Sequence, residues 1–330
     1  MEFSLDGKTI LVTGGSGSIG SALVRGLFDL NPGKIVVFSR DETKQFIMKR
    51  RLADDRLETV VGDVRNHRTI EDVLEKYRPV IVYHVAAMKH LTMCESFPLE
   101  AVSTNVIGTQ NVVNMARRYD VSRLVNISTD KTVYPSTVLG STKLIGERIV
   151  ANAGYTSVRF GNVAGSRGSV IPVLTDEMLR HKRLTITDMR VTRFILTIEE
   201  AVHMILKATT LAAGGDTFLL RMKAFKLSDL VKVLIEEIGP ENGLSRNEIS
   251  VREIGLLKGE KLHEELATYE ELAQSSTLPD MYILTKDQKR DTSEYELSRF
   301  NDRSSGQLSH LSKADLSKLV HSIVPHQESF

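Results

Sequence analysis

The stretch TILVTGGSGSIG, residues 9–20, decides the fold of this 330-residue chain. An apolar run of strand length leads into three glycines spaced three residues apart, Gly14, Gly17 and Gly20, and a helical pattern follows directly. A strand, a glycine-rich turn and a helix in this order form the first unit of a doubly wound α/β domain that binds a dinucleotide. Glycine is expected where the chain turns tightly, where backbone approaches a pyrophosphate, and where the helix packs on the sheet.

Apolar runs of strand length continue to alternate with helical patterns through the first half of the chain. The predicted strands are Thr9–Val12, Lys34–Ser39, Leu57–Val61, Val80–Val85, Arg123–Ser128 and Thr156–Phe160. Strands that are apolar on both faces are typical of a parallel sheet covered by helices on both sides. Asn66 is the expected N-cap of the helix that contains Ile70 and Tyr77.

The regular alternation of apolar strand runs with helical patterns ends after about Val163. Helices are predicted near Pro172–His181, Glu199–Leu211 and Ser228–Ile238, and short strands at Thr217–Arg221 and Ile249–Glu253. We therefore predict a dinucleotide-binding domain over residues 1–163, a smaller mixed α/β substrate lobe over 164–284, and a C-terminal arm over 285–330. Within the arm, only Ala314–Ile323 has a helical pattern.

Composition excludes several classes of protein. With 43 Lys+Arg against 42 Asp+Glu, the chain lacks the basic surplus expected of a nucleic-acid partner. Its longest apolar stretch, Pro79–Met88, is shorter than the roughly 20 residues that a membrane helix requires. The N-terminus, MEFSLDGK, has no signal-peptide pattern. The single Cys94 cannot form an internal disulfide, so a cytoplasmic setting and no metal site are expected.

The end of the second strand bears on the choice of dinucleotide. NAD sites usually carry an acid here to bind the ribose 2′-hydroxyl, whereas this chain has Ser39 and Arg40, with Lys44 one helical turn later. A hydroxyl and two cations favour a 2′-phosphate, so NADP is predicted and NAD is the alternative. The competing interpretation is that Arg40 and Lys44 belong to a solvated helix face. Asp63, after the third strand, is expected to meet the adenine.

Polar side chains cluster where the fifth strand ends. Thr129, Asp130 and Lys131 offer a hydroxyl, a carboxyl acid and an amine base at the edge of the sheet where doubly wound folds bind their ligands. Such a group can carry general acid–base chemistry if burial moves its pKa values toward neutrality. The alternative is a helix cap with a surface ion pair.

Nine stretches between residue 13 and about residue 266 resemble the extended short-chain dehydrogenase/reductase family. Within it they resemble the CapD-like polysaccharide-biosynthesis group of UDP-N-acetylglucosamine 4,6-dehydratases. The stretches are TGGSGSIG, SRDETKQ, GDVRN, HVAAMKH, CESFPLEAVSTNVIGTQNV, STDKTVYP, VRFGNVAGSRGSVIP, TITDMRVTRF and GEKLHEEL.

The resemblance implies a Rossmann-type fold and a redox-neutral reaction on a UDP-sugar. NADP⁺ takes hydride from sugar C4, water is eliminated across C5 and C6, and hydride returns to C6. The product would be a UDP-4-keto-6-deoxy-hexosamine, inverted at C5, for surface-glycan biosynthesis. A homo-oligomer between dimer and hexamer is also implied.

The same resemblance implies roles for individual residues. Asp130 would be the acid and Lys131 the base, with Thr129 near the C4 oxygen. Lys143 would hold the nicotinamide ribose, and Asn105 would support the site from a neighbouring helix. The implied dinucleotide-binding set is Gly14, Ser16, Gly17, Ser18, Ile19, Gly20, Ser39, Arg40, Lys44, Asp63, Val64, Ala86, Ala87, Lys89, Asn105 and Lys143. The implied UDP-sugar-binding set is Lys89, His90, Asn162, Arg167, Gly168, Ser169, Val170, Pro172, Thr187, Arg193 and Glu260, of which Arg193 and Glu260 are alternatively a surface pair.

One position departs from the family pattern. Leu139 stands four residues before Lys143, where these dehydrogenases usually carry a tyrosine that takes the hydroxyl proton. Another group must then be the C4 base, and Lys131 or Asp130 is favoured over Tyr134. The departure keeps a non-catalytic NADP(H)-binding regulator open as an alternative. A UDP-N-acetylhexosamine 4-epimerase is the alternative among enzymes. The intact Asp130 and Lys131 favour elimination, which needs an acid and a base at C5 and C6.

Overall fold

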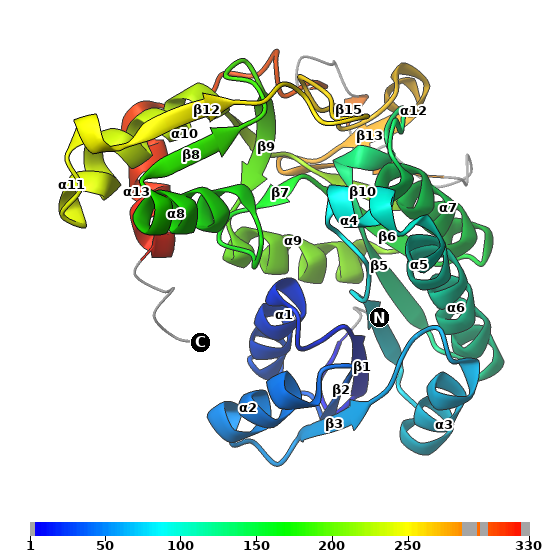
Figure 1. The fold of residues 1–330 in the computed structure, drawn as a ribbon. Helices are drawn as coiled ribbons and strands as arrows, with labels where there is room; N and C mark the ends of the chain where they lie inside the picture. The colour runs from blue at the N-terminus through cyan, green and yellow to red at the C-terminus, as the bar shows by residue number, and fades with distance from the viewer. Residues whose placement is uncertain (1–3, 286–295, 298–302, 325–330) are drawn as a thin grey trace.

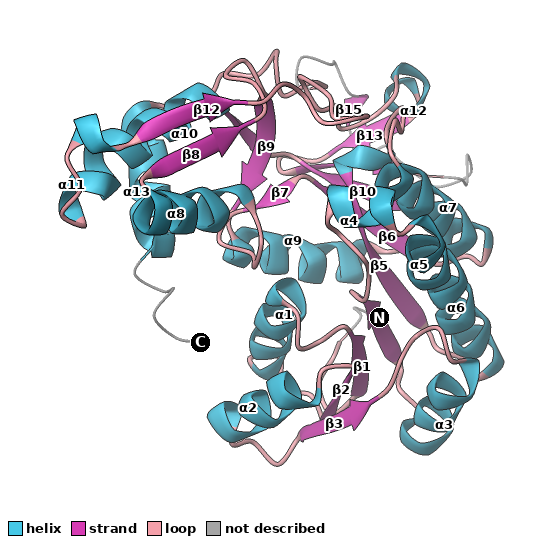
Figure 2. Cartoon of the chain, in the orientation of Figure 1, coloured by secondary structure: helices cyan, strands magenta, loops and turns pink. Residues whose placement is uncertain are grey.

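A ten-stranded sheet organises the computed structural model, which describes residues 4–285, 296–297 and 303–324 (Figures 1 and 2). The strand order is β15-β13-β14-β10-β6-β5-β4-β1-β2-β3. All strands from β10 to β3 run parallel to their neighbours, and β14, β13 and β15 continue the sheet antiparallel. The strands are β1 (Thr9–Thr13), β2 (Lys34–Ser39), β3 (Leu57–Val61), β4 (Ile81–His84), β5 (Arg123–Thr129), β6 (Thr156–Phe160), β10 (Thr217–Leu220), β13 (Ser275–Thr277), β14 (Met281–Leu284) and β15 (Glu296–Leu297).

Helices cover both faces of the parallel strands, as expected for a doubly wound fold. Ile10 and Val12 of β1 belong to the core under α1 (Ser18–Phe28) and α9 (Ile198–Leu211). Leu11, between them, belongs to the core under α3 (His67–Tyr77) and α6 (Gly108–Arg118). This alternation follows from the two-residue period of a strand, and it confirms the predicted fold class. Helices α2 (Glu42–Leu52) and α7 (Val138–Asn152) complete this part of the molecule.

A smaller lobe lies beside the carboxyl ends of these strands (Figure 1). It contains a three-stranded sheet, β11-β9-β7, and a two-stranded sheet, β12-β8, around a separate apolar core. Its elements are β7 (Asn162–Val163), α8 (Val170–His181), β8 (Arg183–Ile186), β9 (Thr192–Leu196), β11 (Lys223–Lys226), α10 (Leu227–Val233), η3 (Leu234–Ile238), α11 (Gly239–Glu241), η4 (Arg246–Glu248), β12 (Ser250–Glu253) and α13 (Lys313–Ile323). The remaining short elements are α4 (Leu91–Ser96), α5 (Pro98–Val102), η1 (Ser103–Ile107), η2 (Asp130–Thr132) and α12 (Tyr269–Ala273).

Most predicted elements are present, with small differences at their ends. β2, β3 and β6 have the predicted bounds, β1 and β5 extend one residue further, and β4 is shorter by one residue at each end. The side chain of Asn66 caps α3 by accepting a hydrogen bond from the Arg68 N–H, so that prediction is confirmed. Strands β7, β8, β9, β11, β13, β14 and β15 were not predicted. The division after residue 163 stays a prediction, because the later strands β10, β13 and β14 extend the sheet of the earlier part.

A buried ion triad joins the sheet to the segments around it. Arg159 on β6, about 1% exposed, forms ion pairs with Glu147 of α7 at 2.7 Å and with Glu271 of α12 at 2.8 Å. Its Nη1 also donates to the Leu266 carbonyl at 3.1 Å. On the other side, the Thr132 hydroxyl donates both to the Thr129 carbonyl and, at 3.4 Å, to Glu147. The triad therefore fixes the turn after β5 and the segment before α12 relative to each other.

The triad predicts a large stability loss for Arg159→Met. The substitution keeps a long apolar stem but leaves the buried Glu147 carboxylate and the partly buried Glu271 carboxylate without their cation, so we expect the free energy of unfolding to fall by about 3–5 kcal/mol. Urea unfolding followed by circular dichroism measures the change. Arg180→Met is the matched control, since Arg180 pairs with Asp176 on an exposed helix surface and its loss should change stability little. Equal effects of the two substitutions would contradict the structural role of the triad.

Candidate functional site

A cavity of about 590 Å³ opens at the carboxyl ends of the parallel strands, next to the point where the strand order reverses between β1 and β4. Doubly wound folds bind their ligands at this switch point. The N-terminus of α1 lies at the cavity, and no side chain caps it. From the predicted dinucleotide-binding set, the cavity lining contains Gly14, Ser16, Gly17, Ser18, Ile19, Gly20, Ser39, Arg40, Lys44, Asp63, Val64, Ala86, Ala87 and Lys89.

The glycine turn has no room for side chains at two positions. Gly14 has a φ of +67°, and a Cβ there would lie 2.7 Å from the Ala86 backbone nitrogen. A Cβ on Gly20 would lie 2.4 Å from the Gly14 carbonyl oxygen. The turn thus brings bare backbone to the start of α1, where free N–H groups and the helix dipole favour a phosphate. These features fit a dinucleotide.

The predicted cations Arg40 and Lys44 line this cavity, and each has an acidic partner. Lys44 Nζ donates to Asp41 at 2.5 Å, and Arg40 lies 3.7 Å from Asp63. Hydrogen bonds from Lys44 lower the pKa of Asp41, so this carboxyl is charged at neutral pH. The Arg40 side chain is 59% exposed and keeps the freedom to contact a ligand.

A second cavity of about 360 Å³ continues from the first. The two share lining residues at the ends of β1 and β4, including Ile19, Lys89 and His90. Thr129, Lys131, Lys143 and Leu139 also line the second cavity, as do Asn162, Gly168, Ser169 and Val170 from the smaller lobe. A ligand here would lie between the two lobes and against the end of a bound dinucleotide.

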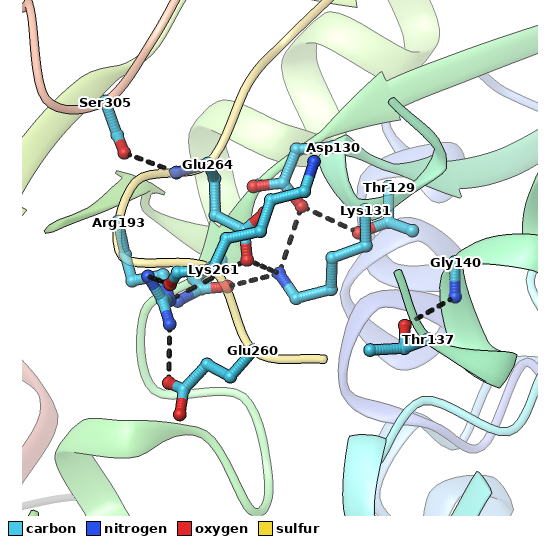
Figure 3. A network of polar contacts seen from close by, with 12 residues as sticks. Thr129, Asp130, Lys131, Thr137, Gly140, Arg193, Glu260, Lys261, Glu264 and Ser305 are labelled. Carbon is cyan, nitrogen blue, oxygen red and sulfur yellow. Dashed lines mark hydrogen bonds and ion pairs between the residues drawn. The ribbon is translucent and has the colours of Figure 1, made fainter. Parts of the chain in front are cut away.

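Lys131 is the centre of a polar network beside the second cavity (Figure 3). Its Nζ donates to Asp130 Oδ1 at 3.1 Å and to Asn162 Oδ1 at 3.4 Å, and lies 3.5 Å from Glu264 Oε1. The Thr129 hydroxyl donates to the same Asp130 oxygen at 2.9 Å. Asp130 itself is fully buried behind these residues, and its Oδ2 has no hydrogen-bond partner among the described residues.

Burial and neighbouring charges act against each other in this network. Burial raises the pKa of Asp130, and the opposing effect of the Lys131 charge does not restore it. Burial alone would lower the pKa of Lys131, but the Asp130 and Glu264 carboxylates outweigh it and raise that pKa. At neutral pH, Lys131 is therefore an ammonium with a carboxyl group on either side.

Lys143 occupies a different environment. Its Nζ donates to the Ile127 carbonyl at 2.6 Å, and burial lowers its pKa to about 8, with the Glu147 charge acting in the opposite direction. It lines the second cavity one helical turn after Leu139. Leu139 is buried and presents a hydrocarbon surface to the cavity. Tyr134 lines neither cavity.

The loop that follows β7 contributes to both cavities. Arg167, predicted to bind the sugar nucleotide, lines the dinucleotide cavity instead. Its Nη2 donates to the Ser16 carbonyl at 2.6 Å, its backbone N–H donates to Ser18 Oγ, and its carbonyl accepts from Lys89 Nζ at 2.6 Å. The smaller lobe is thereby fastened to the glycine turn.

Several predicted residues lie outside both cavities. Asn105 is buried and holds the chain after β4, since its side chain accepts from the Met88 N–H and donates to the Met88 carbonyl. Arg193, Glu260 and Thr187 contact one another: Arg193 donates to Glu260 at 2.6 Å and Thr187 donates to it at 3.3 Å. Pro172 lies in the first turn of α8.

Glu264 was not predicted. It is buried, it pairs with Lys131, and it lies 3.8 Å from Arg193 Nε. It occurs in the GEKLHEEL stretch four residues after Glu260, which was chosen from the same motif. The i, i+4 spacing of two acids was the available signal, but nothing in the sequence places this segment against Lys131.

Two negative findings concern the part of the chain that the structure describes. Within it, no group of three or more His, Cys, Asp or Glu side chains is arranged to hold a metal ion. No helix among those same residues combines the length and apolar character that a membrane crossing demands.

Comparison with known proteins identifies relatives over most of the chain. Residues 10–286 match the family described as "Polysaccharide biosynthesis protein". A Methanocaldococcus jannaschii protein named "Uncharacterized membrane protein MJ1061" is 42% identical over 286 residues, covering 84% of this chain and 85% of that protein. A Rickettsia canadensis protein named "UDP-glucose 4-epimerase" is 36% identical over 293 residues, covering 85% of this chain and 83% of that protein.

Solved structures agree with this assignment. The X-ray structure of Pen from Bacillus thuringiensis is 36% identical and matches with a TM-score of 0.91, over 98% of this chain and 99% of that one. Structures of a dTDP-glucose 4,6-dehydratase and a UDP-glucose 4-epimerase, at 20% and 18% identity, match with TM-scores of 0.72 and 0.68 and share the fold alone. They confirm the predicted doubly wound, Rossmann-type fold. The chain belongs to the polysaccharide biosynthesis protein family.

Proposed function

We propose that this protein is an NADP-dependent UDP-N-acetylglucosamine 4,6-dehydratase that inverts C5. Family membership and relatives support the coarser class, a nucleotide-sugar enzyme of the dehydratase or epimerase type in polysaccharide biosynthesis. The observation that carries the finer proposal is the Thr129–Asp130–Lys131 network at a cavity continuous with the dinucleotide cavity. It provides a buried acid, Asp130, and a cavity-lining base, Lys131, beside the space for a sugar.

The dinucleotide would be held by the glycine turn, the N-terminus of α1 and Arg167. When bound, it supplies reversible hydride transfer, first from sugar C4 and then to C6. Arg40 and Lys44 support a 2′-phosphate, although the Asp41 partner of Lys44 reduces the local positive charge. Lys143 would hold the nicotinamide ribose from the second cavity.

The residues of the chain would manage three proton movements. Lys131, after releasing one proton of its ammonium to solvent, removes the C4 hydroxyl proton in place of the missing tyrosine, because it lines the cavity whereas Tyr134 does not. It passes this proton to the Asp130 carboxylate. The 4-keto group acidifies C5, and the Lys131 amine then takes the C5 proton. Asp130 as the carboxylic acid, through Thr129, protonates the C6 oxygen as water leaves. Return of a proton to the opposite face of C5 gives inversion.

The sugar nucleotide would lie along the smaller lobe. Lys89 and His90 line both cavities, and Ser169 begins α8, where an N-terminus favours phosphate. The linked side chains Arg193, Glu260 and Thr187 would accept the uridine end, with Glu260 binding ribose hydroxyls. Asn162 would contact the sugar from beside Lys131.

A UDP-hexosamine 4-epimerase is the second candidate, and the 36%-identical relatives named UDP-glucose 4-epimerase favour it. Epimerisation returns hydride to C4 and requires no proton transfer at C5. Epimerisation would use Lys131 at the C4 hydroxyl but has no use for Asp130 as an acid at C6, so the Asp130–Lys131 pair favours the dehydratase.

The deciding experiment incubates the protein with UDP-N-acetylglucosamine and catalytic NADP⁺ in deuterated water. We expect a product that has lost one water and carries deuterium at C5, detected by mass spectrometry and NMR, with C5 coupling constants of the inverted sugar. A C4-inverted product of unchanged elemental composition would contradict the dehydratase and establish the epimerase.

Lys131→Ala tests the base directly. The substitution should abolish deuterium incorporation at C5, by at least about 100-fold given the usual contribution of a general base, while NADP⁺ affinity stays within twofold. Lys182→Ala is the control, because Lys182 pairs with Glu248 on the surface. Exchange at the normal rate in Lys131→Ala would exclude Lys131 as the base.

Arg40→Ala tests the choice of dinucleotide. Removal of one charge-assisted contact to the 2′-phosphate should weaken NADP⁺ binding by about tenfold or more. NAD⁺ binding, which lacks that contact, should change little. Calorimetric titration with both dinucleotides measures this, and an equal loss for the two would contradict the assignment of Arg40 to the 2′-phosphate.

A further inference from the structure

Three structural elements converge on the Lys131 ammonium. Asp130 comes from the turn after β5 and Glu264 from the segment before α12 (Figure 3). Asn162 comes from β7. The three oxygens lie 3.1, 3.4 and 3.5 Å from Nζ. An ammonium has three donors, so this shell satisfies a charged Lys131. Two of the three acceptors are carboxylates, although one would be enough to neutralise it.

Glu264 is held in this position from behind. Its backbone N–H donates to Ser305 Oγ at 2.9 Å, and its carbonyl accepts from the Ser305 N–H at 2.9 Å. Ser305 is fully buried and also contacts the Thr192 hydroxyl at 2.8 Å. The carboxylate therefore reaches Lys131 from a backbone that is tied down on both sides.

Four charged side chains act on Lys131 or Glu264. Asp130 and Glu264 are the carboxylates, and Arg193 and Lys261 are the further cations. Burial raises the pKa of Glu264, but the charges of Lys131, Arg193 and Lys261 outweigh burial and lower it. Glu264 thus stays ionised, and its negative charge raises the pKa of both Lys131 and Asp130.

We propose that Glu264 is a positioning residue for proton transfer, whose carboxylate holds the Lys131 ammonium against Asp130 and fixes the number of protons that this pair carries. This inference rests on the proposed function for its chemical meaning. Lys131 becomes the base when one N–H bond breaks and the proton forms an O–H bond on Asp130, 3.1 Å away. The same transfer gives Asp130 the proton that it delivers to the leaving C6 oxygen. Glu264 neither gains nor loses a proton in this step.

The test is the ionisation of Lys131 in the ligand-free protein. Lysine labelled with ¹³C and ¹⁵N is followed by NMR from pH 6 to 11, and Lys131→Arg assigns the signal. In Glu264→Gln the Lys131 midpoint should fall by about one pH unit or more, because a negative charge within 4 Å is lost. Glu264→Asp keeps the charge but withdraws it by one methylene, so it should give a smaller shift in the same direction.

Glu265→Gln is the matched control, because Glu265 pairs with Lys261 and Arg303 rather than with Lys131. Its Lys131 midpoint should equal that of the unmodified protein. An unchanged midpoint in Glu264→Gln, or an equal shift in Glu265→Gln, would overturn the inference.

A second measurement links the ionisation to the reaction. The rate of deuterium incorporation at C5 is recorded against pH for the same variants. Loss of the Glu264 charge in Glu264→Gln lowers the pKa of the base, Lys131, so the rising limb of the profile should begin at lower pH. It also lowers the pKa of the acid, Asp130, so the falling limb should begin at lower pH as well. A profile that keeps its position would contradict the inference. Absence of C5 exchange in the unmodified protein would contradict the proposed function instead, while the NMR midpoints still decide the role of Glu264 toward Lys131.

Discussion

The buried Arg159 guanidinium is the interaction on which the arrangement of the site depends. A charge inside a protein is tolerated only when it is paired and its donors are satisfied. Arg159 meets this condition by taking one carboxylate from α7 and one from α12, together with the Leu266 carbonyl. Helix α7 carries Leu139 and Lys143, and the segment that ends at Leu266 carries Glu264. One side chain on β6 thus sets the relative positions of groups that lie on opposite sides of the second cavity.

The ionic groups around Arg159 and around Lys131 differ in a way that matters for chemistry. All three guanidinium nitrogens of Arg159 donate hydrogen bonds to carboxylate or carbonyl oxygens. A guanidinium does not release its proton in proteins. Around Lys131 the cation can release a proton, a neighbouring carboxyl has a raised pKa, and one oxygen of that carboxyl has no partner among the described residues. The first group can only hold structure together. The second combines mobile protons with access to a cavity, which is what acid–base chemistry requires.

Sequence reasoning succeeded where the signal was local. The apolar runs predicted β1 to β6, because strands buried on both faces must be apolar throughout, and the glycine-rich turn that the sequence singled out lines the first cavity. It failed where the outcome depends on packing between distant segments. Arg167 was assigned to the sugar nucleotide, yet the loop turns its side chain onto the glycine turn. Glu264 was missed because its ion pair with Lys131 joins two segments that lie far apart in the sequence. No glycine or proline flanks the short strands β8 and β9, so the sequence did not mark where these strands begin and end.

The contact between Ser305 and Glu264 has a consequence for the order in which the molecule is completed. A chain is made from its N-terminus, and all the elements around the glycine turn precede residue 220, whereas the support for Glu264 comes from residue 305. A nascent chain on the ribosome therefore contains every residue that lines the first cavity well before Ser305 is made. The Glu264 backbone can gain its support from Ser305 only after that, so the first cavity and the contact behind Glu264 are completed at different stages of synthesis.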